Sequence, residues 1–368
     1  MRIAGNQRNI YLLAMGLLLI AAVLACMWTF GGTETASDAV TTPAPAESEA
    51  PLEEIAEETA LPSEDVSEAN AAQDANTIST VVYYQDNYGY LVPVMCRIPQ
   101  QEGVAKATLS MMVKSSENDM SAARLGLRTI LPENTTIDLD ISNGLARVDL
   151  GKQVLDMPDA AAETGMISAV VQALTEFDTV NRVEFLIDGQ KREKLTHGTD
   201  VSGTFERGDI NLETVAPTSA NVKPVTLYFP CESASVVVPV TRMVYSKPDV
   251  NTAVLELAKG PSTVSPLEGA LPKGCGLIGV TVENGIAKVN FTKEFADMID
   301  NADGGRLALK ALVLTCTQFD GIDGVEIYVE GEKYDPGENT LNVPTFANVA
   351  GEIVNTYIQT QSDMIFQD

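Results

Sequence analysis

One stretch of this chain occurs twice, and this repetition constrains the fold more than any other feature. Residues 143–150 read NGLARVDL and residues 284–291 read NGIAKVNF, while EFLIDG at 184–189 is matched by EIYVEG at 326–331. The offset between the copies is 141 residues for the first pair and 142 for the second. Such even spacing predicts a tandem duplication of one domain, so a shared function must be sought in the repeated unit.

Length and charge narrow the class of protein further. The 368 residues are enough for two domains with extensions. Asp and Glu total 51 against 24 Lys and Arg, which gives a net charge of -27. Such a surface repels the phosphates of nucleic acids and anionic lipid head groups. We therefore expect no nucleic-acid partner.

Residues 1–30 predict a signal or membrane-anchor segment rather than part of a folded domain. Arg2 and Arg8 precede an uncharged apolar run over residues 10–30. At ~1.5 Å per residue, a helix over this run spans the ~30 Å core of a bilayer. The positive charges before the run predict a cytoplasmic N-terminus, which places the remainder at the cell membrane on the extracytoplasmic side.

Cys26 is a candidate for lipidation. It ends the tetrapeptide VLAC, which is similar to the lipobox at which bacterial signal peptides are cleaved. However, Leu24 is bulky for its position, and the apolar run continues through Met27 and Trp28, as in an uncleaved single-pass helix. Either a lipid or an N-terminal helix would tether the chain to the membrane.

The composition then divides the chain into a linker, two domains and a tail. Residues 31–78 contain 12 acidic residues and no basic residue, which predicts a self-repelling, disordered linker. The first domain is predicted over 79–212 and the second over 222–347. Residues 348–368 are left as a C-terminal tail.

Each copy predicts the same element order, β-β-α-β-β-α-β. Alternating and helical spacings predict elements at 80–84, 91–96, 106–114, 160–177 and 183–187, and again at 225–229, 236–240, 250–259, 304–319 and 325–329, with a hairpin in the middle of each copy. The predicted fold class is α+β: tandem two-layer domains with helices packed against a mixed sheet. A proline in the second strand of each copy predicts an edge position.

The Asn-Gly pairs fix the register of the two hairpins. Asn143-Gly144 and Asn284-Gly285 favour two-residue type I′ turns. With such turns, six cross-strand pairs form one core face: Ile141 with Ala146, Leu139 with Val148, Ile137 with Leu150, Val282 with Ala287, Val280 with Val289 and Ile278 with Phe291. The opposite face pairs Asp140 with Arg147 and Thr281 with Lys288, so we expect it to be solvated.

The cysteines outside the anchor do not predict a metal site. Cys96, Cys231, Cys275 and Cys316 show neither a CxxC pair nor metal-ligand spacing. Extracytoplasmic disulfides remain an alternative, although three cysteines in the second copy leave one over. Cys316 falls on the apolar side of a predicted helix, which predicts a buried thiol.

Catalytic chemistry has little support in the sequence. Three pairs of acids occupy equivalent positions, and paired acids held ~5–10 Å apart can hydrolyse glycosides: Asp178 with Asp320, Glu184 with Glu326, and Asp188 with Glu330. The third pair precedes glycines, where acidic turn residues are ordinary. His197 has no counterpart in the second copy, so a histidine-activated nucleophile would exist only once. We therefore predict no catalytic residues and no cofactor.

The repeated pattern resembles a known family. TLYF, VPV, AKGP, NGIAKVNF and TQFDGIDGVEIYVEG, found with their counterparts over residues 80 to about 345, are similar to the GerMN domain of bacterial sporulation and germination proteins. The layout of anchor, spacer and two domains is similar to that of lipoproteins in this family. The resemblance implies a fold like the ring-building-motif domains of secretion systems, and partners among envelope or sporulation-channel proteins.

These observations lead to a functional hypothesis with two alternatives. We expect a non-enzymatic, membrane-anchored envelope scaffold that acts in sporulation or germination through tandem protein-binding domains. The alternatives are a cell-wall accessory module that binds peptidoglycan and a glycan hydrolase. The acidic load also predicts that the ectodomain alone is monomeric at low salt.

Overall fold

The structure is a computed structural model that describes residues 76–213, 221–231, 235–245, 247–298, 302–335, 344 and 346–351. These residues all belong to one compact unit over 65–368. The predicted anchor with Cys26, nearly all of the predicted linker and the tail beyond residue 351 lie outside the described residues. Among the residues that the structure does describe, no helix is both long and apolar enough to cross a membrane.

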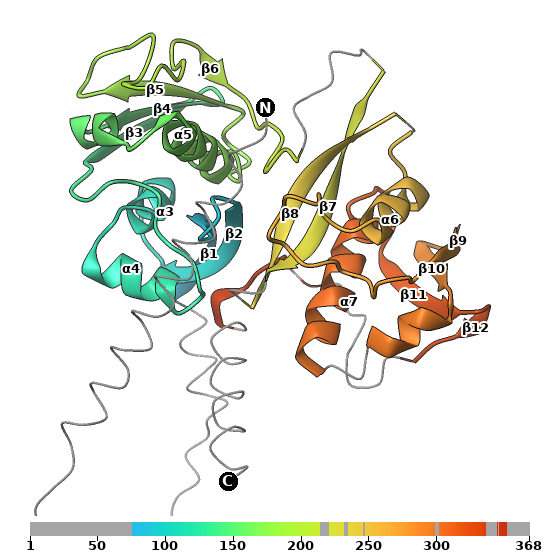
Figure 1. The fold of residues 1–368 in the computed structure, drawn as a ribbon. Helices are drawn as coiled ribbons and strands as arrows, with labels where there is room; N and C mark the ends of the chain where they lie inside the picture. Colours follow the sequence, from blue (N-terminus) through green and yellow to red (C-terminus); the bar gives the residue numbers. More distant parts are fainter. Residues whose placement is uncertain are drawn as a thin grey trace, which may run out of the picture. The chain divides into compact units, whose positions relative to one another are not determined.

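The two repeats follow each other along the chain (Figure 1). The first consists of β1 (Thr77–Gln85), β2 (Leu91–Pro99), α3 (Val104–Met111), α4 (Ser116–Ala123), β3 (Ile137–Ser142), β4 (Leu145–Leu150), the 3-10 helix η1 (Lys152–Asp156), α5 (Ala160–Leu174), β5 (Arg182–Ile187) and β6 (Thr204–Phe205). The second consists of β7 (Lys223–Cys231), β8 (Val236–Val244), α6 (Val250–Ala258), β9 (Leu277–Glu283), β10 (Ile286–Phe291), η2 (Lys293–Met298), α7 (Ala302–Thr317), β11 (Gly324–Val329) and β12 (Glu332–Lys333).

Each repeat contains one mixed sheet and one antiparallel ribbon. The mixed sheets have the strand orders β3-β4-β5-β6 and β12-β11-β10-β9, with a parallel pair in each, β4 with β5 and β10 with β11. The α+β class with mixed sheets is confirmed. The first two strands of each repeat do not join that sheet, however, and instead form the separate ribbons β1-β2 and β7-β8.

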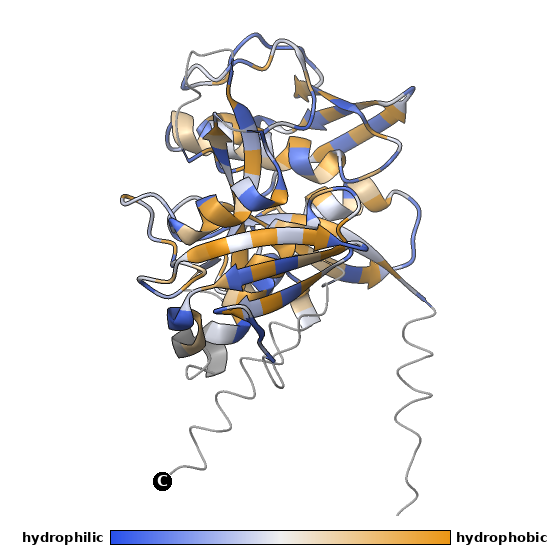
Figure 2. Cartoon of the chain, turned by 90° about the vertical axis from the view of Figure 1, so that its right-hand side faces the viewer, coloured by the Kyte–Doolittle hydropathy of each residue, from blue (hydrophilic) through white to orange (hydrophobic). Residues whose placement is uncertain are grey.

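Helices cover one face of these sheets and ribbons. In the first repeat α5 contacts β1 and β5, and in the second α7 contacts β7, β8 and β11. The predicted apolar stripes are buried, with Met166 and Leu174 on α5 and Leu312 and Cys316 on α7 all fully inaccessible. Figure 2 shows the alternating hydropathy along the strands, which places one face of each in the core.

Both hairpins turn as predicted. Asn143 and Gly144 have φ of 52° and 76°, and Asn284 and Gly285 have φ of 51° and 79°. Positive φ at both turn residues is the requirement of a type I′ turn, which Asn and Gly satisfy with little strain. The register of the first hairpin is confirmed at all three core pairs, Ile137 with Leu150, Leu139 with Val148 and Ile141 with Ala146.

The predicted register of the second hairpin is correct near the turn and wrong at its far end. Val282 pairs with Ala287 and Val280 with Val289, but Leu277 rather than Ile278 faces Phe291, because the register shifts between Asn290 and Phe291. This irregularity inserts one residue into β9 and turns Ile278 outward, where 51% of it is exposed. The predicted core face is also less buried near both turns, where Ile141 and Val282 are exposed.

Helix α4 was not predicted from the sequence. Its N-cap is Ser115, whose hydroxyl accepts a hydrogen bond from the Asn118 N–H at 3.1 Å, and Glu117 and Asp119 lie in the first turn, where they suit the helix dipole. Only Ala122 on this helix is buried. The helix therefore lacks the apolar periodicity on which the sequence prediction relied.

Candidate functional site at the junction of the repeats

The proline-bearing strands of the two repeats meet each other. β2 contains Leu91-Val92-Pro93-Val94 and β8 contains Val237-Val238-Pro239-Val240, and the two strands are in contact. Each belongs to a two-stranded ribbon, which confirms the predicted edge position. Since proline has no N–H, these edges cannot form a regular ladder with each other.

An asparagine side chain from the first repeat bridges the two edges. The Asn211 carboxamide accepts a hydrogen bond from the Leu91 N–H at 2.8 Å and donates to the Leu91 carbonyl at 2.8 Å. The same amide nitrogen donates to the carbonyl of Pro239 in the second repeat at 2.7 Å. The side chain thus acts as a short substitute for a neighbouring strand.

Asn348 forms the same set of bonds from the other side. Its carboxamide accepts from the Val237 N–H at 2.9 Å and donates to the Val237 carbonyl at 2.8 Å and to the Pro93 carbonyl at 3.0 Å. Asn348 is 1% exposed. Each asparagine therefore holds its own repeat at two points and the other repeat at a proline carbonyl.

The junction consequently has an approximate twofold character. Leu91 corresponds to Val237 and Pro93 to Pro239, each pair 146 residues apart, and exchanging the repeats exchanges the bonds of the two asparagines. In homodimers such self-complementary surfaces are called isologous. Here both halves lie in one chain.

A second contact anchors the end of the first repeat in the second. The Arg242 guanidinium lies 2.6 Å from the Glu213 carboxylate and 3.3 Å from that of Glu256. It also donates to the Gly260 carbonyl at 2.8 Å, within the AKGP segment singled out in the sequence. The side chains of Glu213 and Arg242 are only 4% and 14% exposed. Burial of a fully paired ion pair favours one fixed arrangement of the groups that it joins.

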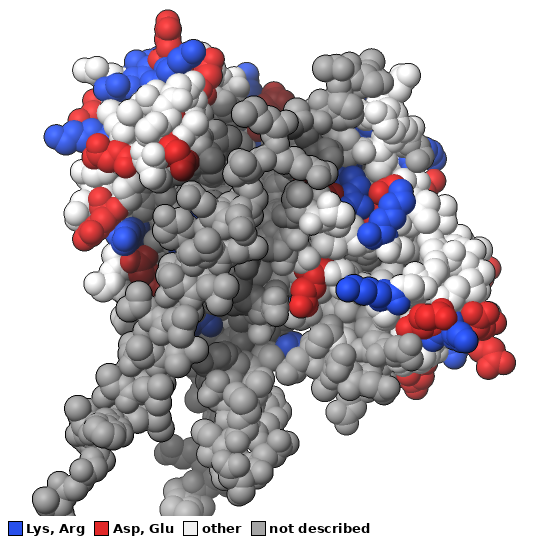
Figure 3. Space-filling view, viewed as in Figure 1, with Lys and Arg blue, Asp and Glu red and all other residues white. Residues whose placement is uncertain are grey.

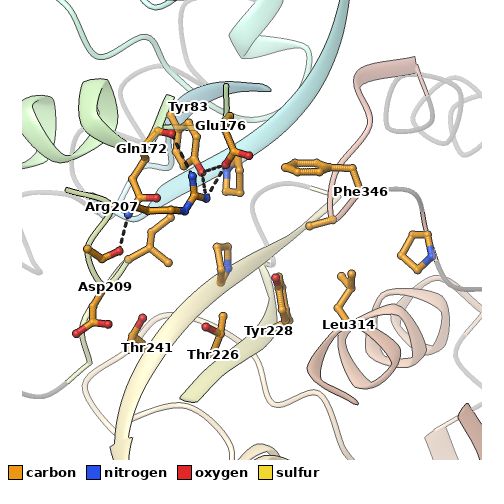
Figure 4. Close-up of a pocket in the computed structure, with 16 residues that line it drawn as sticks. Tyr83, Gln172, Glu176, Arg207, Asp209, Thr226, Tyr228, Thr241, Leu314 and Phe346 are labelled. Carbon is orange, nitrogen blue, oxygen red and sulfur yellow. Dashed lines mark hydrogen bonds and ion pairs between the residues drawn. The ribbon is translucent and has the colours of Figure 1, made fainter. Parts of the chain in front are cut away.

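A cleft of about 380 Å³ opens at this junction (Figure 4). Its lining contains pairs of residues at equivalent positions of the two repeats: Tyr83 with Tyr228, Pro93 with Pro239, Gln172 with Leu314, and Ile210 with Ala347. The cleft therefore lies on the approximate twofold axis, between two walls of common origin.

The wall from the first repeat is polar. The Tyr83 hydroxyl donates to Glu176 at 2.7 Å and accepts from Arg207 at 3.0 Å, and Arg207 lies 2.5 Å from Glu176. Burial, together with the Glu176 carboxylate, raises the pKa of Tyr83 well above its ordinary value. Burial acts to lower the pKa of Arg207, but Tyr83 and Glu176 outweigh it and raise that pKa overall. The three groups form a closed hydrogen-bonded network around the Arg207–Glu176 ion pair.

The wall from the second repeat is largely apolar. Leu314 stands at the position of Gln172, and Phe346 at the position of Asp209, two residues before the respective asparagine. Burial raises the pKa of Tyr228. Among the described residues, no hydrogen-bond partner is found for the Tyr228 hydroxyl. Charged groups, the available Tyr228 hydroxyl and an apolar surface suit this cleft to binding.

The acids predicted as candidate hydrolytic pairs do not converge on a site. Glu184 pairs with Lys191 at 2.5 Å and with Arg147 at 3.1 Å, and Glu326 pairs with Lys333 at 2.7 Å. Hydrogen bonds from the two lysines hold the pKa values of Glu184 and Glu326 below their ordinary range. A glycosidase acid needs the opposite shift.

The other two pairs of acids are turn residues. Asp188 and Glu330 have φ of 53° and 51°, which fits the predicted structural use before a glycine. Asp178 and Asp320 are exposed. The face of the molecule shown in Figure 3 has acidic and basic side chains interspersed, as these ion pairs lead one to expect.

The remaining candidate residues have structural environments. His197 is exposed in its loop, as predicted, and its ring nitrogen Nε2 lies 2.7 Å from the Met157 carbonyl. Cys96, Cys231, Cys275 and Cys316 are all buried, which confirms the expectation of a buried thiol at Cys316. Within the described ranges, no cluster of three or more His, Cys, Asp or Glu side chains is arranged to hold a metal ion.

The sequence reasoning missed the residues that form the junction. Arg207 and Asn211 were assigned to the end of the first domain and Asn348 to the tail. One signal was available. Each repeat is followed by an asparagine between two apolar residues, as INL at 210–212 and ANV at 347–349.

The fold and the junction together define a class: proteins with two tandem α+β repeats joined by a matched interface. The profile of the Germane family, described as sporulation and spore germination, matches residues 81–193 and 226–335. This chain belongs to that family, and the resemblance found in the sequence is confirmed.

A similar sequence and a similar solved structure support this assignment. The spore germination protein GerM of Bacillus subtilis (strain 168) is 28% identical over 275 residues, which cover 72% of this chain and 75% of that protein. A solved structure of the tandem GerMN domains of the sporulation protein GerM from Bacillus subtilis matches with a TM-score of 0.60 and 26% identity. The match covers 74% of this chain and 99% of that structure.

Proposed function

We propose that this protein is a non-enzymatic, membrane-anchored scaffold of the cell envelope that acts in sporulation or spore germination through its tandem domains. The observation that carries the proposal is the junction: two equivalent domains are held in one arrangement by matched asparagine bonds and a buried ion-pair network. A fixed pair of domains presents its outer surfaces to partners in a defined geometry.

The chemistry of the repeats agrees with a binding function. The carboxylates Glu184 and Glu326 are engaged by basic side chains and have lowered pKa values, and His197 belongs to one repeat only. Many of the residues shared by the two copies build turns and core. Partners among envelope or sporulation-channel proteins, and tethering through residues 1–30, are part of the proposal.

The test is localisation combined with deletion in sporulating cells of the source organism. A fluorescent fusion should concentrate at the membranes around the developing spore, and deletion should lower spore yield or germination efficiency. Diffuse cytoplasmic signal together with normal spores would contradict the proposal. Incorporation of a labelled fatty acid that is lost in a Cys26→Ser variant would identify the anchor as a lipid, whereas a parent protein that takes up no label and keeps residues 1–25 would identify it as an uncleaved helix.

A peptidoglycan-binding accessory function is the second candidate, and one feature favours it. A shallow hollow of about 370 Å³ lies on the outer face of the second sheet, over Gly279, where Thr281, Lys288, Asn290 and Tyr328 line it. Hydroxyl, amide and aromatic groups around an open hollow suit a sugar. Co-sedimentation of the protein with purified sacculi would support this candidate, whereas release of soluble fragments that depends on Glu184 and Glu326 would indicate a hydrolase.

A further inference from the structure

We propose that the cleft at the repeat junction binds a basic side chain, arginine or lysine, presented by an exposed segment of a partner protein. The inference rests on the proposed scaffold function and adds to it one binding surface and the chemistry of the partner. Three properties of the cleft lead to it. A hydrogen bond present in the first repeat is missing from the second, one negative charge is unbalanced, and one wall is apolar.

The first half of the cleft already contains the interaction that the second half lacks. Four residues before Asn211 stands Arg207, whose guanidinium donates to the Tyr83 hydroxyl at 3.0 Å. Four residues before Asn348 stands Pro344, which has no donor. The Tyr228 hydroxyl, equivalent to that of Tyr83, has no hydrogen-bond partner among the described residues. A basic side chain from a partner protein would donate the hydrogen bond that the Tyr228 hydroxyl lacks.

The charges around the cleft favour a cation. Arg207 is balanced by Glu176 at 2.5 Å. The exposed Asp209 carboxylate also lines the cleft, and it has no ion pair or hydrogen bond within the described residues. One negative charge is therefore unbalanced there. The net charge of -27 on the chain acts in the same direction, because it attracts a basic segment from solution.

The opposite wall fits the rest of such a side chain. Leu314 and Phe346 give an apolar surface for the methylene stem, and the Tyr228 ring gives a face for the cationic head (Figure 4). A ligand carboxylate would instead meet Asp209 and would have to displace Glu176 from Arg207. A second copy of this acidic chain is opposed by like charge.

The test compares two peptides that differ in one charge. Each is a fluorescein-labelled extended peptide with glycine and serine around a Leu-X-Leu centre, where X is arginine or its neutral analogue citrulline. Each is titrated against the full chain in nonionic detergent at low salt. We expect the arginine peptide to bind about tenfold more tightly, as one charge-assisted hydrogen bond would provide.

Three variants assign the binding to the cleft. Asp209→Lys should abolish most of the preference for arginine, and Tyr228→Phe should weaken arginine binding several-fold while retaining the ring. Glu332→Lys is the matched control, because it makes the same charge change at an exposed residue on β12, away from the cleft. It should leave the affinity within about twofold of the parent value.

The outcomes separate this inference from the proposed function. Equal binding of the two peptides, or equal loss in Asp209→Lys and Glu332→Lys, would overturn the cleft assignment even if the protein surrounds the developing spore. A protein with normal arginine binding but without the predicted location and deletion phenotype would instead overturn the scaffold function.

Discussion

Asn348 shows how one side chain can hold two domains together. Its amide bonds three backbone groups that have no strand partner, and it is almost completely buried. A buried backbone polar group left without a partner costs about 1–3 kcal/mol. Loss of the Asn348 side chain would therefore matter mainly because it leaves backbone groups of Val237 and Pro93 without a hydrogen-bond partner.

Replacement of Asn348 by alanine should accordingly destabilise the protein by about 3 kcal/mol, since water can reach some of the released groups but not all of them. The free energy of unfolding, measured by urea denaturation, tests this. Asn251→Ala, at an exposed position on α6, is the control and should change that free energy by less than about 0.5 kcal/mol. An equal effect of the two substitutions would show that the asparagine bonds contribute nothing specific.

Glu163 gives a prediction about pH. It is fully buried on α5, and its carboxylate accepts from the His197 N–H at 2.7 Å and the Thr199 N–H at 3.3 Å. Burial acts to raise the pKa of Glu163, but these hydrogen bonds lower it overall. Since the folded pKa is lowered, the stabilisation is fully present above the unfolded pKa of about 4.3 and disappears as the pH falls through the folded value.

Glu163→Gln should therefore reduce the free energy of unfolding at neutral pH, and the difference from the parent protein should shrink as the pH is lowered below about 4.3. Urea denaturation of both proteins across this range measures the difference. A difference that stays constant with pH would show that the carboxylate charge does not stabilise this loop.

Among the elements, the hairpins were predictable because their rules are local. Asn-Gly fixes the turn, and alternation fixes the face, so five of the six core pairs follow from the sequence alone. The sixth was wrong because the irregularity in β9 depends on how the strand meets its neighbour at Asn290 and Phe291. The local sequence propensity of β9 carries no information on how the strand pairs at these two residues.

The register of β9 can be tested by two adjacent substitutions. Leu277→Lys should destabilise the second repeat by about 2 kcal/mol, because Leu277 packs against the core opposite Phe291. Ile278→Lys should be nearly neutral, since that side chain is already half exposed. Urea denaturation distinguishes them, and the reverse order of effects would restore the register predicted from the sequence.

The junction was harder to predict from the sequence, for a different reason. Its bonds join residues far apart in the chain, such as Asn348 and Pro93, which are 255 residues apart. Asparagine is common in exposed loops, and neither residue belongs to a periodic pattern that would mark it as buried. Arg207 was equally hidden, because its partners Tyr83 and Glu176 lie on separate elements. Only the assembled fold reveals the cleft.

For the molecule as a whole, charge and duplication have opposite effects on association. Two similar domains could offer repeated surfaces to further copies, but the net charge of -27 opposes their approach. The matched edges that would otherwise attract a second copy are already paired within the chain. Self-association is thus disfavoured by electrostatics and by the prior use of the complementary surface.

We therefore expect a chain without the predicted anchor segment, residues 1–30, to be monomeric at low salt, where repulsion is screened least. Light scattering coupled to size-exclusion chromatography measures its mass, with the same sample at high salt as the control for screening. Stable rings or larger assemblies at low salt would contradict this expectation.

The asymmetry of the cleft has one further consequence. A symmetric homodimer would present two identical walls, so a bound segment could lie across it in either chain direction with equal energy. Here Arg207 stands on one side and Pro344 on the other, and exchanging the walls no longer restores the same site. The fused pair can therefore give a bound strand a single polarity, which two identical subunits could not do.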